Sequence, residues 1–311
     1  MSDDPEGAVI LLYHGVTNAV SEGIENFSGK HLAANEFTRQ MAWLAANAHP
    51  MRLNEMAEQL VSGEGLPPRS FAVTFDDSYR NKAHVALPIL KQHGIPATFF
   101  ISTGFVGTDR VFWTDRIEHA LGWTKRSALR IRLDNGVHDF PLNDAAQRID
   151  AVDALKRAMK LMPPVERDRV LTDVESEADV QDDIDAVENY QLLDWDGVRT
   201  LDEGADYEVG GHSVNHEVLS TLNPAELNAE IDGCLNALSR ELNREVRSFS
   251  YPEGQPEHYN ETVVAALKRR GIRVCPSAIH GVNRPGADPF HLRRIMVGFV
   301  GAAFPFPAYS H

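Results

Sequence analysis

Short apolar runs rich in Val, Ile and Phe alternate along this chain with longer amphipathic stretches, and this alternation limits the fold more than any other feature. The apolar runs are predicted strands, at residues 9–14, 70–76, 97–102, 207–212, 248–251, 272–275 and 294–297. Helical periodicity appears between them, at residues 36–47, 54–61, 79–93, 224–243 and 257–270. Strands that alternate with helices are typical of β/α units around a parallel sheet.

About seven such units favour a closed barrel. We therefore expect an α/β protein built as a distorted (β/α) barrel of about seven strands, similar to a TIM barrel. An open doubly wound sheet is the alternative, because spacing alone does not decide between the two arrangements. We expect a single catalytic domain over residues 1–311, with an insertion at about 107–194.

The insertion interrupts the alternation of strands and helices. Residues 129–140 alternate apolar with polar side chains around an Asn-Gly pair, which predicts a β-hairpin. Charged helical stretches follow at residues 144–162 and 165–177, with two prolines between them. The insertion is either a surface excursion on the barrel rim or a lid over a substrate.

Composition excludes several classes of partner. The 30 Lys and Arg residues against 45 Asp and Glu residues give a net charge of −15, which repels nucleic acid and anionic membranes. No window approaches the ~20 apolar residues of a membrane helix. The acidic N-terminus does not resemble a secretory signal, so we expect a cytoplasmic protein. Cys234 and Cys275 are interpreted as reduced and buried, and a homo-oligomer is left open.

Two adjacent carboxylates, Asp76 and Asp77, follow a continuous apolar strand. Barrel active sites are built at the C-terminal ends of strands, where the chain turns and both side chains can reach one pocket. Two acids this close do not ionise independently unless a cation relieves their repulsion. A surface turn is the alternative interpretation of the pair.

A second polar turn follows the strand at 207–212 and contains His212 and His216. If a helical twist begins at Ser213, the two imidazoles lie at i and i+4 on one face and can hold one metal ion. Accidental spacing is the alternative in a chain with 13 histidines. Two His ligands and one carboxylate, with open positions, form a catalytic metal set.

Two further strand ends contribute candidate residues. His14 ends the first strand, where it either serves the site or bonds to the backbone. Residues 248–254 form a strand and a Pro/Gly turn, which could direct a backbone N–H into the same pocket.

These residues together resemble the polysaccharide deacetylases of carbohydrate esterase family four, which have the NodB homology fold. Thr74-Phe-Asp-Asp-Ser78 is similar to the family's T-F-D-D-G, with Ser78 in place of Gly, and His212-Ser-Val-Asn-His216 is similar to H-[ST]-x-x-H. Pro96-Ala-Thr-Phe-Phe-Ile101 and Tyr251-Pro-Glu-Gly254 resemble two weaker blocks. Tyr13-His14-Gly15-Val16 resembles the group that opens with Tyr-His-x-Val, as the biofilm poly-N-acetylglucosamine deacetylases do.

The resemblance implies a role for each candidate residue. Asp77, His212 and His216 would hold a divalent metal, expected to be Zn²⁺, with Co²⁺ or Ni²⁺ as alternatives. Asp76 would be the general base that accepts a proton from water.

Three more roles follow from the same resemblance. His14 would be the acid that protonates the leaving amine, and the N–H of Glu253 would stabilise the oxyanion. Arg294 would steady the catalytic aspartate, with Arg247 and Arg293 as competing candidates.

The implied activity is hydrolysis of N-acetyl groups on the amino sugars of a polysaccharide, oligosaccharide or glycan precursor. One alternative is a deformylase or another amidase that acts on a lipid-linked amino sugar or a small amide. A second alternative is a glycan-binding protein with an inactive site.

Overall fold

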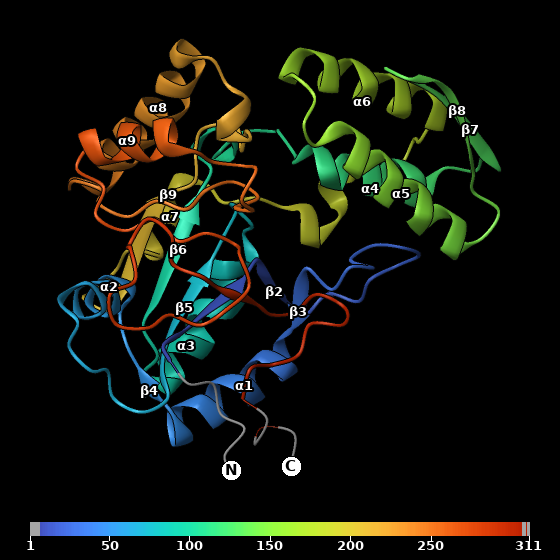
Figure 1. Cartoon of the computed structure of the whole chain (residues 1–311). Coiled ribbons are helices and arrows are strands. Elements are labelled where there is room, and N and C mark those ends of the chain that lie inside the picture. The colour runs from blue at the N-terminus through green and yellow to red at the C-terminus, as the bar shows by residue number, and fades with distance from the viewer. Residues whose placement is uncertain (1–6, 307–308, 310–311) are drawn as a thin grey trace. The chain divides into compact units, whose positions relative to one another are not determined.

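The predicted strands form a parallel sheet whose order is β10-β1-β5-β6-β9, and β4 pairs with the beginning of β5. Figure 1 labels β4, β5, β6 and β9 of this sheet. The computed structural model describes residues 7–306 and Tyr309 of the chain. The strands are β1 Val9–Tyr13, β4 His49–Pro50, β5 Ser70–Phe75, β6 Ala97–Ile101, β9 Tyr207–Gly211 and β10 Ile295–Met296. The expected α/β class with a parallel sheet is confirmed.

Beyond β9 the hydrogen-bonded circuit continues through single bridges rather than regular strands. These parallel bridges are Gly211↔Phe249, Ser248↔Val274 and His280↔Arg294, and they lead back to β10. The predicted strands at 248–251 and 272–275 are therefore reduced to isolated pairings. Pro252 and Pro276 follow them directly and have no N–H to extend the ladder. The result is the distorted arrangement that the sequence predicts.

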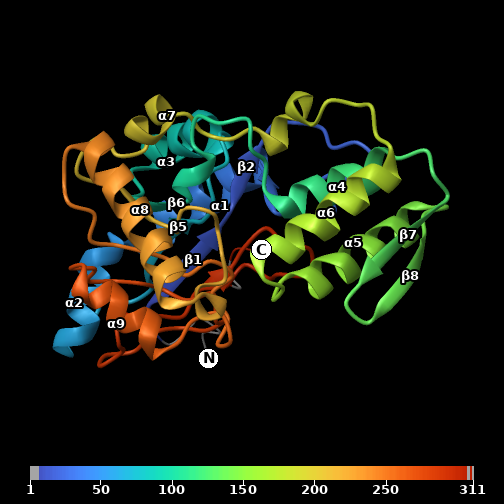
Figure 2. The ribbon, with the colours of Figure 1, turned by 90° about the horizontal axis from the view of Figure 1, so that it is seen from above.

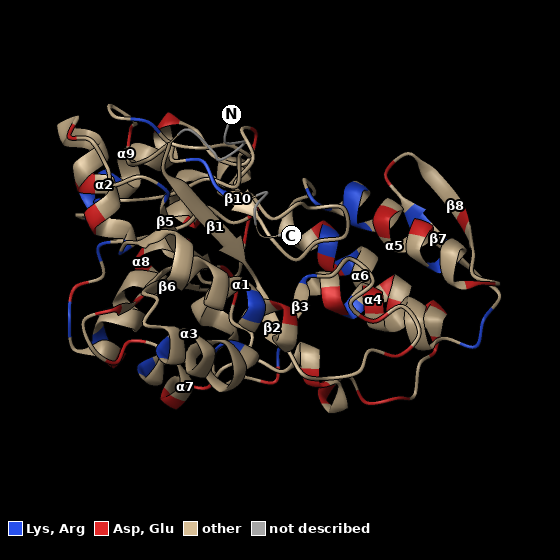
Figure 3. Ribbon diagram, turned by 90° about the horizontal axis from the view of Figure 1, so that it is seen from below, with Lys and Arg blue, Asp and Glu red and all other residues tan. Residues whose placement is uncertain are grey.

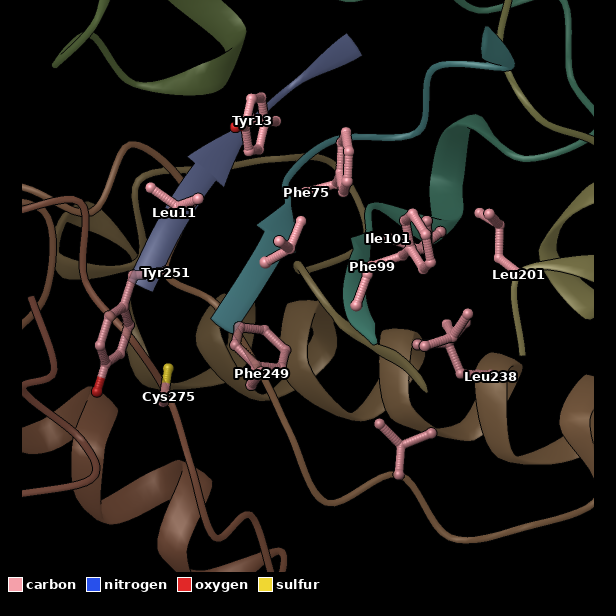
Figure 4. Close-up of a cluster of buried hydrophobic side chains, with 14 of the residues drawn as sticks. Leu11, Tyr13, Phe75, Phe99, Ile101, Leu201, Leu238, Phe249, Tyr251 and Cys275 are labelled. Atoms are coloured by element: carbon pink, nitrogen blue, oxygen red, sulfur yellow. The ribbon is translucent and has the colours of Figure 1, made fainter. Parts of the chain in front are cut away.

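Successive residues of each central strand face two different cores, which explains why the strands are apolar throughout. Odd-numbered positions pack against the surrounding helices: Val9, Leu11 and Tyr13 of β1, Phe71, Val73 and Phe75 of β5, and Phe99 and Ile101 of β6. Figure 4 shows Leu11, Tyr13, Phe75, Phe99 and Ile101 in this cluster. The alternate residues Ile10, Ala72 and Phe100 join a separate cluster on the inner face of the sheet, which the apolar side chains of residues 51–60 complete. Thr74 and Asp76 continue this inner set, so Asp76 lies at the end of the inward-facing row.

Helices lie around the sheet (Figure 2). They are α1 Ala34–Asn47, α2 Leu53–Ser62, α3 Leu87–His93, α7 Trp195–Thr200, α8 Pro224–Leu242 and α9 Glu261–Arg269. Lys, Arg, Asp and Glu appear on these helices and on the loops, whereas β1 has none (Figure 3). A short parallel pair, β2 Gly15–Thr17 and β3 His31–Ala33, joins the first strand to α1.

Two predicted helices are shorter than expected. The helix predicted at 79–93 begins as a π-helical turn, Lys82–Ala86, and continues as α3. Pro88 supplies no N–H to the carbonyl four residues before it, and the wider turn accommodates that loss. The helix predicted at 257–270 begins only at Glu261, because the side chain of Asn260 accepts the N–H of Val263 and caps it there.

A second compact unit comprises residues 19–28 and 109–191, and the first unit comprises the rest of the chain. Most of the second unit falls within the expected insertion at 107–194, and residues 19–28 are an unexpected addition. Its elements are α4 Trp113–Trp123, β7 Ala128–Leu133, β8 Gly136–Pro141, α5 Ala145–Met159 and α6 Pro164–Ala178. The predicted hairpin is confirmed, with its turn at Asp134 and Asn135, one residue earlier than the Asn-Gly pair.

Short 3₁₀ turns complete the described chain at Thr103–Phe105, Ile184–Ala186, Glu188–Tyr190 and Leu219–Thr221. Across the described residues, no helix is both long and apolar enough to cross a membrane. Cys234 and Cys275 are free and buried, as predicted.

Candidate metal centre

Asp76 and Asp77 lie at the C-terminal end of β5, and both are buried. Strand alternation would send these two side chains to opposite faces. Asp77, however, has a φ of 72°, a left-handed conformation that turns the chain. Asp76 therefore keeps the inward direction of the strand while Asp77 leaves it. The left-handed residue is Asp77 and not Ser78, so glycine is not required at position 78.

Ser78 instead connects two strand ends. Its hydroxyl donates to the carbonyl of Ser102 at 3.0 Å and accepts the N–H of Ser102 at 3.0 Å. Ser102 directly follows β6, so the hydroxyl ties the turn after β5 to the neighbouring strand. A glycine at position 78 could not make either bond.

His212 and His216 follow β9 in an irregular turn, and the helical twist considered for this segment is absent. Ser213 and His216 have φ values of 63° and 57°, which bring the two imidazoles together without a helix. Their ring centroids are 4.9 Å apart. Glu230 of α8 holds the turn by accepting the N–H groups of Val214 and Asn215 at 2.9 and 2.8 Å.

The ligand atoms of Asp77, His212 and His216 all lie within 4.8 Å of one another. Asp77 Oδ1 is 3.2 Å from His216 Nε2 and 3.8 Å from His212 Nε2. His212 Nδ1 lies 2.8 Å from the carbonyl oxygen of Ser250, which can only accept, so Nδ1 carries the hydrogen. Nε2 of His212 is thereby left with its lone pair toward Asp77. A backbone partner of this kind is typical of metal-ligating histidines, so the residues fit a divalent metal.

The electrostatics of His212 and Asp77 also fit metal binding, whereas His216 must give up a proton to bind a metal ion. Burial lowers the pKa of His212 to about 4, which keeps the imidazole neutral. Burial by itself raises the pKa of Asp77, but the hydrogen bond and charge of His216 outweigh it, and the pKa lies well below its ordinary value. The same contact with Asp77 raises the pKa of His216 against the effect of burial. Neutral imidazole and ionised carboxylate are the forms that bind metal.

Asp76 is held by a fully buried arginine, Arg294. Nη1 donates to Asp76 Oδ1 at 2.8 Å and Nη2 donates to Asp76 Oδ2 at 2.7 Å. The other guanidinium hydrogens reach Thr74 Oγ1, Ser250 Oγ and the carbonyl of Ser277, so all five N–H groups have acceptors. Burial raises the pKa of Asp76, but the charge of Arg294 is the largest opposing influence, and the pKa falls to about 2.

The two competing arginines lie elsewhere. Arg247 is exposed and pairs with Glu245. Arg293 is also exposed, and its guanidinium donates to the carbonyl of His280 at 3.1 Å. Arg294 is the one of the three candidates that contacts Asp76.

His14 follows β1, with its ring edge-to-face against Phe299 at a centroid distance of 5.3 Å. Its Nδ1 atom is buried and has no hydrogen-bond partner among the described residues. Burial lowers the pKa of His14, whereas the charges of Asp77 and Asp76 raise it. His14 therefore lies close enough to interact electrostatically with both aspartates.

Glu253 lies in the turn after the bridge at Phe249, and its φ is 62°. Its charge helps to raise the pKa of His216, so it lies near the three candidate ligands. Gly254, with a φ of 61°, has no room for a side chain, since a Cβ would lie 2.6 Å from the backbone nitrogen of Ala278. The turn thus packs closely against the segment that contains Ala278, beside the three candidate metal ligands.

Three residues that contact the centre escape prediction from the sequence: Glu230, Ser250 and Lys82. The Lys82 ammonium is fully buried and donates to the backbone carbonyls of both Asp76 and Asp77, at 2.6 Å for the second. Burial lowers the pKa of Lys82 to about 7, although the two aspartates raise it. The contacts of Glu230 and Ser250 join segments that are distant in sequence. The contacts of Lys82 are local, but they depend on the left-handed turn at Asp77, which no motif signals.

Comparison with known proteins identifies relatives of this chain. The sequence profile of the family described as polysaccharide deacetylase matches residues 63–140 and 172–275. Poly-beta-1,6-N-acetyl-D-glucosamine N-deacetylase of Staphylococcus aureus is 34% identical over 145 residues, which are 43% of this chain and 46% of that protein. The protein of the same name from Staphylococcus epidermidis is 30% identical over 138 residues, 44% of this chain and 42% of that protein. The match thus spans less than half the length of these curated relatives.

Solved structures share the fold at low sequence identity. The deacetylase PplD of Streptococcus pyogenes, in complex with acetate, has a TM-score of 0.59 and 17% identity, with coverage of 94% of this chain and 93% of that chain. IcaB from Ammonifex degensii has a TM-score of 0.59 and 19% identity, with the same coverage. Because the family profile matches more than half of the residues, this chain belongs to the polysaccharide deacetylase family.

Proposed function

We propose that this protein is a metal-dependent hydrolase that removes N-acetyl groups from the amino sugars of a glycan. The observation that carries the proposal is the adjacency of two carboxylates in different environments. Asp77 lies within 3.2 Å of His216 in a three-ligand set, whereas Asp76 is held in a bidentate pair by Arg294. One carboxylate is suited to bind a metal and the other to accept a proton.

The metal, which we propose is Zn²⁺ held by Asp77, His212 and His216, would lower the pKa of a water molecule and polarise the acetyl carbonyl. Asp76 accepts the proton that the attacking water loses, and Arg294 keeps this carboxylate ionised before the reaction. The N–H of Glu253 donates to the carbonyl oxygen as negative charge develops there. The imidazolium form of His14 donates a proton to the nitrogen as the C–N bond breaks and becomes neutral imidazole, which yields acetate and an amino sugar.

The substrate class is proposed from the relatives named poly-beta-1,6-N-acetyl-D-glucosamine N-deacetylase. We also propose that residues 1–311 form one catalytic domain that carries the second compact unit as an insertion. Within this unit the family profile matches residues 109–140 and 172–191 and leaves residues 141–171 unmatched, so the unmatched part is the helical segment.

The test is metal analysis together with product analysis on the purified full chain. The protein is stripped with a chelator, reloaded with Zn²⁺, Co²⁺ or Ni²⁺, and incubated with β-1,6-linked and β-1,4-linked N-acetylglucosamine oligomers and with their N-formyl analogues. We expect one metal ion per chain and acetate release from the β-1,6-linked oligomers. Release of formate alone would contradict the proposed acyl group. Failure of the metal-loaded protein to release either acid would contradict the proposed activity.

A further inference from the structure

The turn that carries both aspartates has two backbone carbonyls, those of Asp76 and Asp77, that share one donor. Lys82 Nζ donates to both of them, and its distance to the Asp77 oxygen is 2.6 Å. Successive carbonyl groups of a β-strand point in opposite directions. The carbonyls of Asp76 and Asp77 can therefore bond one amine only if the backbone between them departs from strand geometry. The φ of 72° at Asp77 supplies this departure as a rotation of the backbone.

The same rotation directs the two carboxylates to their different neighbours. Asp76 continues the inward row of β5 toward Arg294, whereas Asp77 turns to His212 and His216. A left-handed conformation is unfavourable for a residue with a side chain, so it persists only where the surroundings hold it. Lys82 is the side chain that bonds both carbonyls flanking this position.

Lys82 is also poorly placed for any other task. Its side chain is fully buried, so it does not contact solvent or a glycan, and it lies in the first turn of the π-helical segment Lys82–Ala86. Both carbonyls that it contacts belong to the aspartates, and buried carbonyls need donors. Its two contacts require two N–H groups, which the charged and the neutral amine both have.

We propose that Lys82 is a positioning residue, which holds the Asp76–Asp77 turn in the conformation that binds the metal. This inference rests on the proposed function and deepens it, because it concerns how the metal site is formed. Lys82 influences metal binding in two opposite ways: its hydrogen bonds preorganise Asp77, and its charge repels a cation. Preorganisation of Asp77 outweighs the repulsion, so that Lys82 strengthens metal binding overall.

The experiment measures the dissociation constant of Zn²⁺ by competition with a chromophoric chelator in wild type, Lys82→Met and Lys82→Gln. Met and Gln have similar lengths, but only Gln has N–H donors and neither has a charge. Loss of outer-shell partners typically weakens metal binding by about 10–100-fold, and we expect a loss in this range for Lys82→Met. Lys82→Gln is expected to recover most of that affinity, because it restores a donor to the turn.

Lys91→Met is the matched control. Lys91 lies on α3, is exposed, and pairs with Glu203 at 3.7 Å, so the same substitution there removes a lysine without touching the turn. Its metal affinity should equal that of the wild type. Thermal melting of each metal-free variant shows whether Lys82→Met remains folded, and Lys82→Gln carries the comparison if it does not.

The outcomes separate the inference from the proposed function. If the wild type binds no Zn²⁺, the proposed function fails. If the wild type binds Zn²⁺ and Lys82→Met binds it equally or more tightly, the positioning role is refuted and repulsion by the charge prevails. If Lys82→Gln is as weak as Lys82→Met, the hydrogen bonds are not what holds the site, and the inference is also refuted.

Discussion

Replacement of Arg294 by methionine should destabilise the protein severely, because it leaves the buried carboxylate of Asp76 without its charged partner. Arg294 is fully buried, and it gives two of its five hydrogen bonds to Asp76, which is itself buried. Removal of one partner of a buried ion pair typically costs about 3–5 kcal/mol, since the other charge is left without compensation. We expect the free energy of unfolding of Arg294→Met to fall by an amount in this range at neutral pH.

The ion pair between Asp76 and Arg294 also determines how the free energy of unfolding changes with pH. In the metal-free wild type the pKa of Asp76 is about 2, below its ordinary value of 3.8, which corresponds to about 2 kcal/mol of stability. This stability is present above the ordinary pKa and is lost as pH falls through the folded pKa. Without Arg294, burial is the largest remaining influence and raises the pKa of Asp76. Protonation then relieves the buried charge, so the deficit of the variant shrinks as pH falls.

The assay is urea unfolding of metal-free wild type and Arg294→Met at about pH 7 and about pH 4.5. Arg293→Met is the control, because its guanidinium is exposed on the neighbouring residue, and surface changes of this kind usually alter stability by less than about 0.5 kcal/mol. A deficit for Arg294→Met that is below 1 kcal/mol, or that is the same at both pH values, would refute the reasoning.

Three further predictions concern the residues around the metal. Asp77→Ala, His212→Ala and His216→Ala should each lose bound metal and activity, and stoichiometric metal in any of them would contradict its role as a ligand. Asp76→Asn should retain the metal while its turnover falls by about 10²–10⁴-fold, and loss of the metal would mean that the two aspartates have the opposite roles. His14→Ala should bind metal, and its rate should fall about 10²–10⁴-fold more on an N-acetyl amide than on an activated phenyl ester, whereas equal losses would indicate a structural histidine.

The elements of the fold are predictable from the sequence to the extent that they depend on local chemistry. The strand at 70–76 and the helix at 224–243 are both present, because each has a periodicity that matches its surroundings. The helix expected at 79–93 lacks its first turn, because Tyr79 forms an isolated bridge with Leu192 that periodicity does not register. Further along, Pro88 has no N–H to donate, and the chain before it forms a π-helical turn. The segments at 248–251 and 272–275 lose their regular pairing for a similar reason, since a proline follows each one.

The candidate site is predictable only where its residues follow strand ends. Asp76, Asp77 and His212 come directly after β5 and β9, and the structure places the three side chains together. The conformation of the His212 turn is not predictable in this way, because Glu230 of α8 determines it through tertiary contacts. The same holds for the choice of Arg294 over its neighbour Arg293, which depends on which of two adjacent side chains enters the barrel.

The different environments of the two aspartates follow from strand geometry and one backbone angle. Ala72, Thr74 and Asp76 form the inward row of β5, and Arg294 reaches that row at both Thr74 and Asp76. Had the strand continued, Asp77 would have shared the face of Val73 and Phe75, which lie in the large apolar cluster, where burial of an ionised carboxylate is costly. The left-handed turn at Asp77 removes it from that face and presents it to two imidazoles. The sequence therefore shows two equivalent neighbours, and the backbone makes one suited to hold a metal and the other to accept a proton.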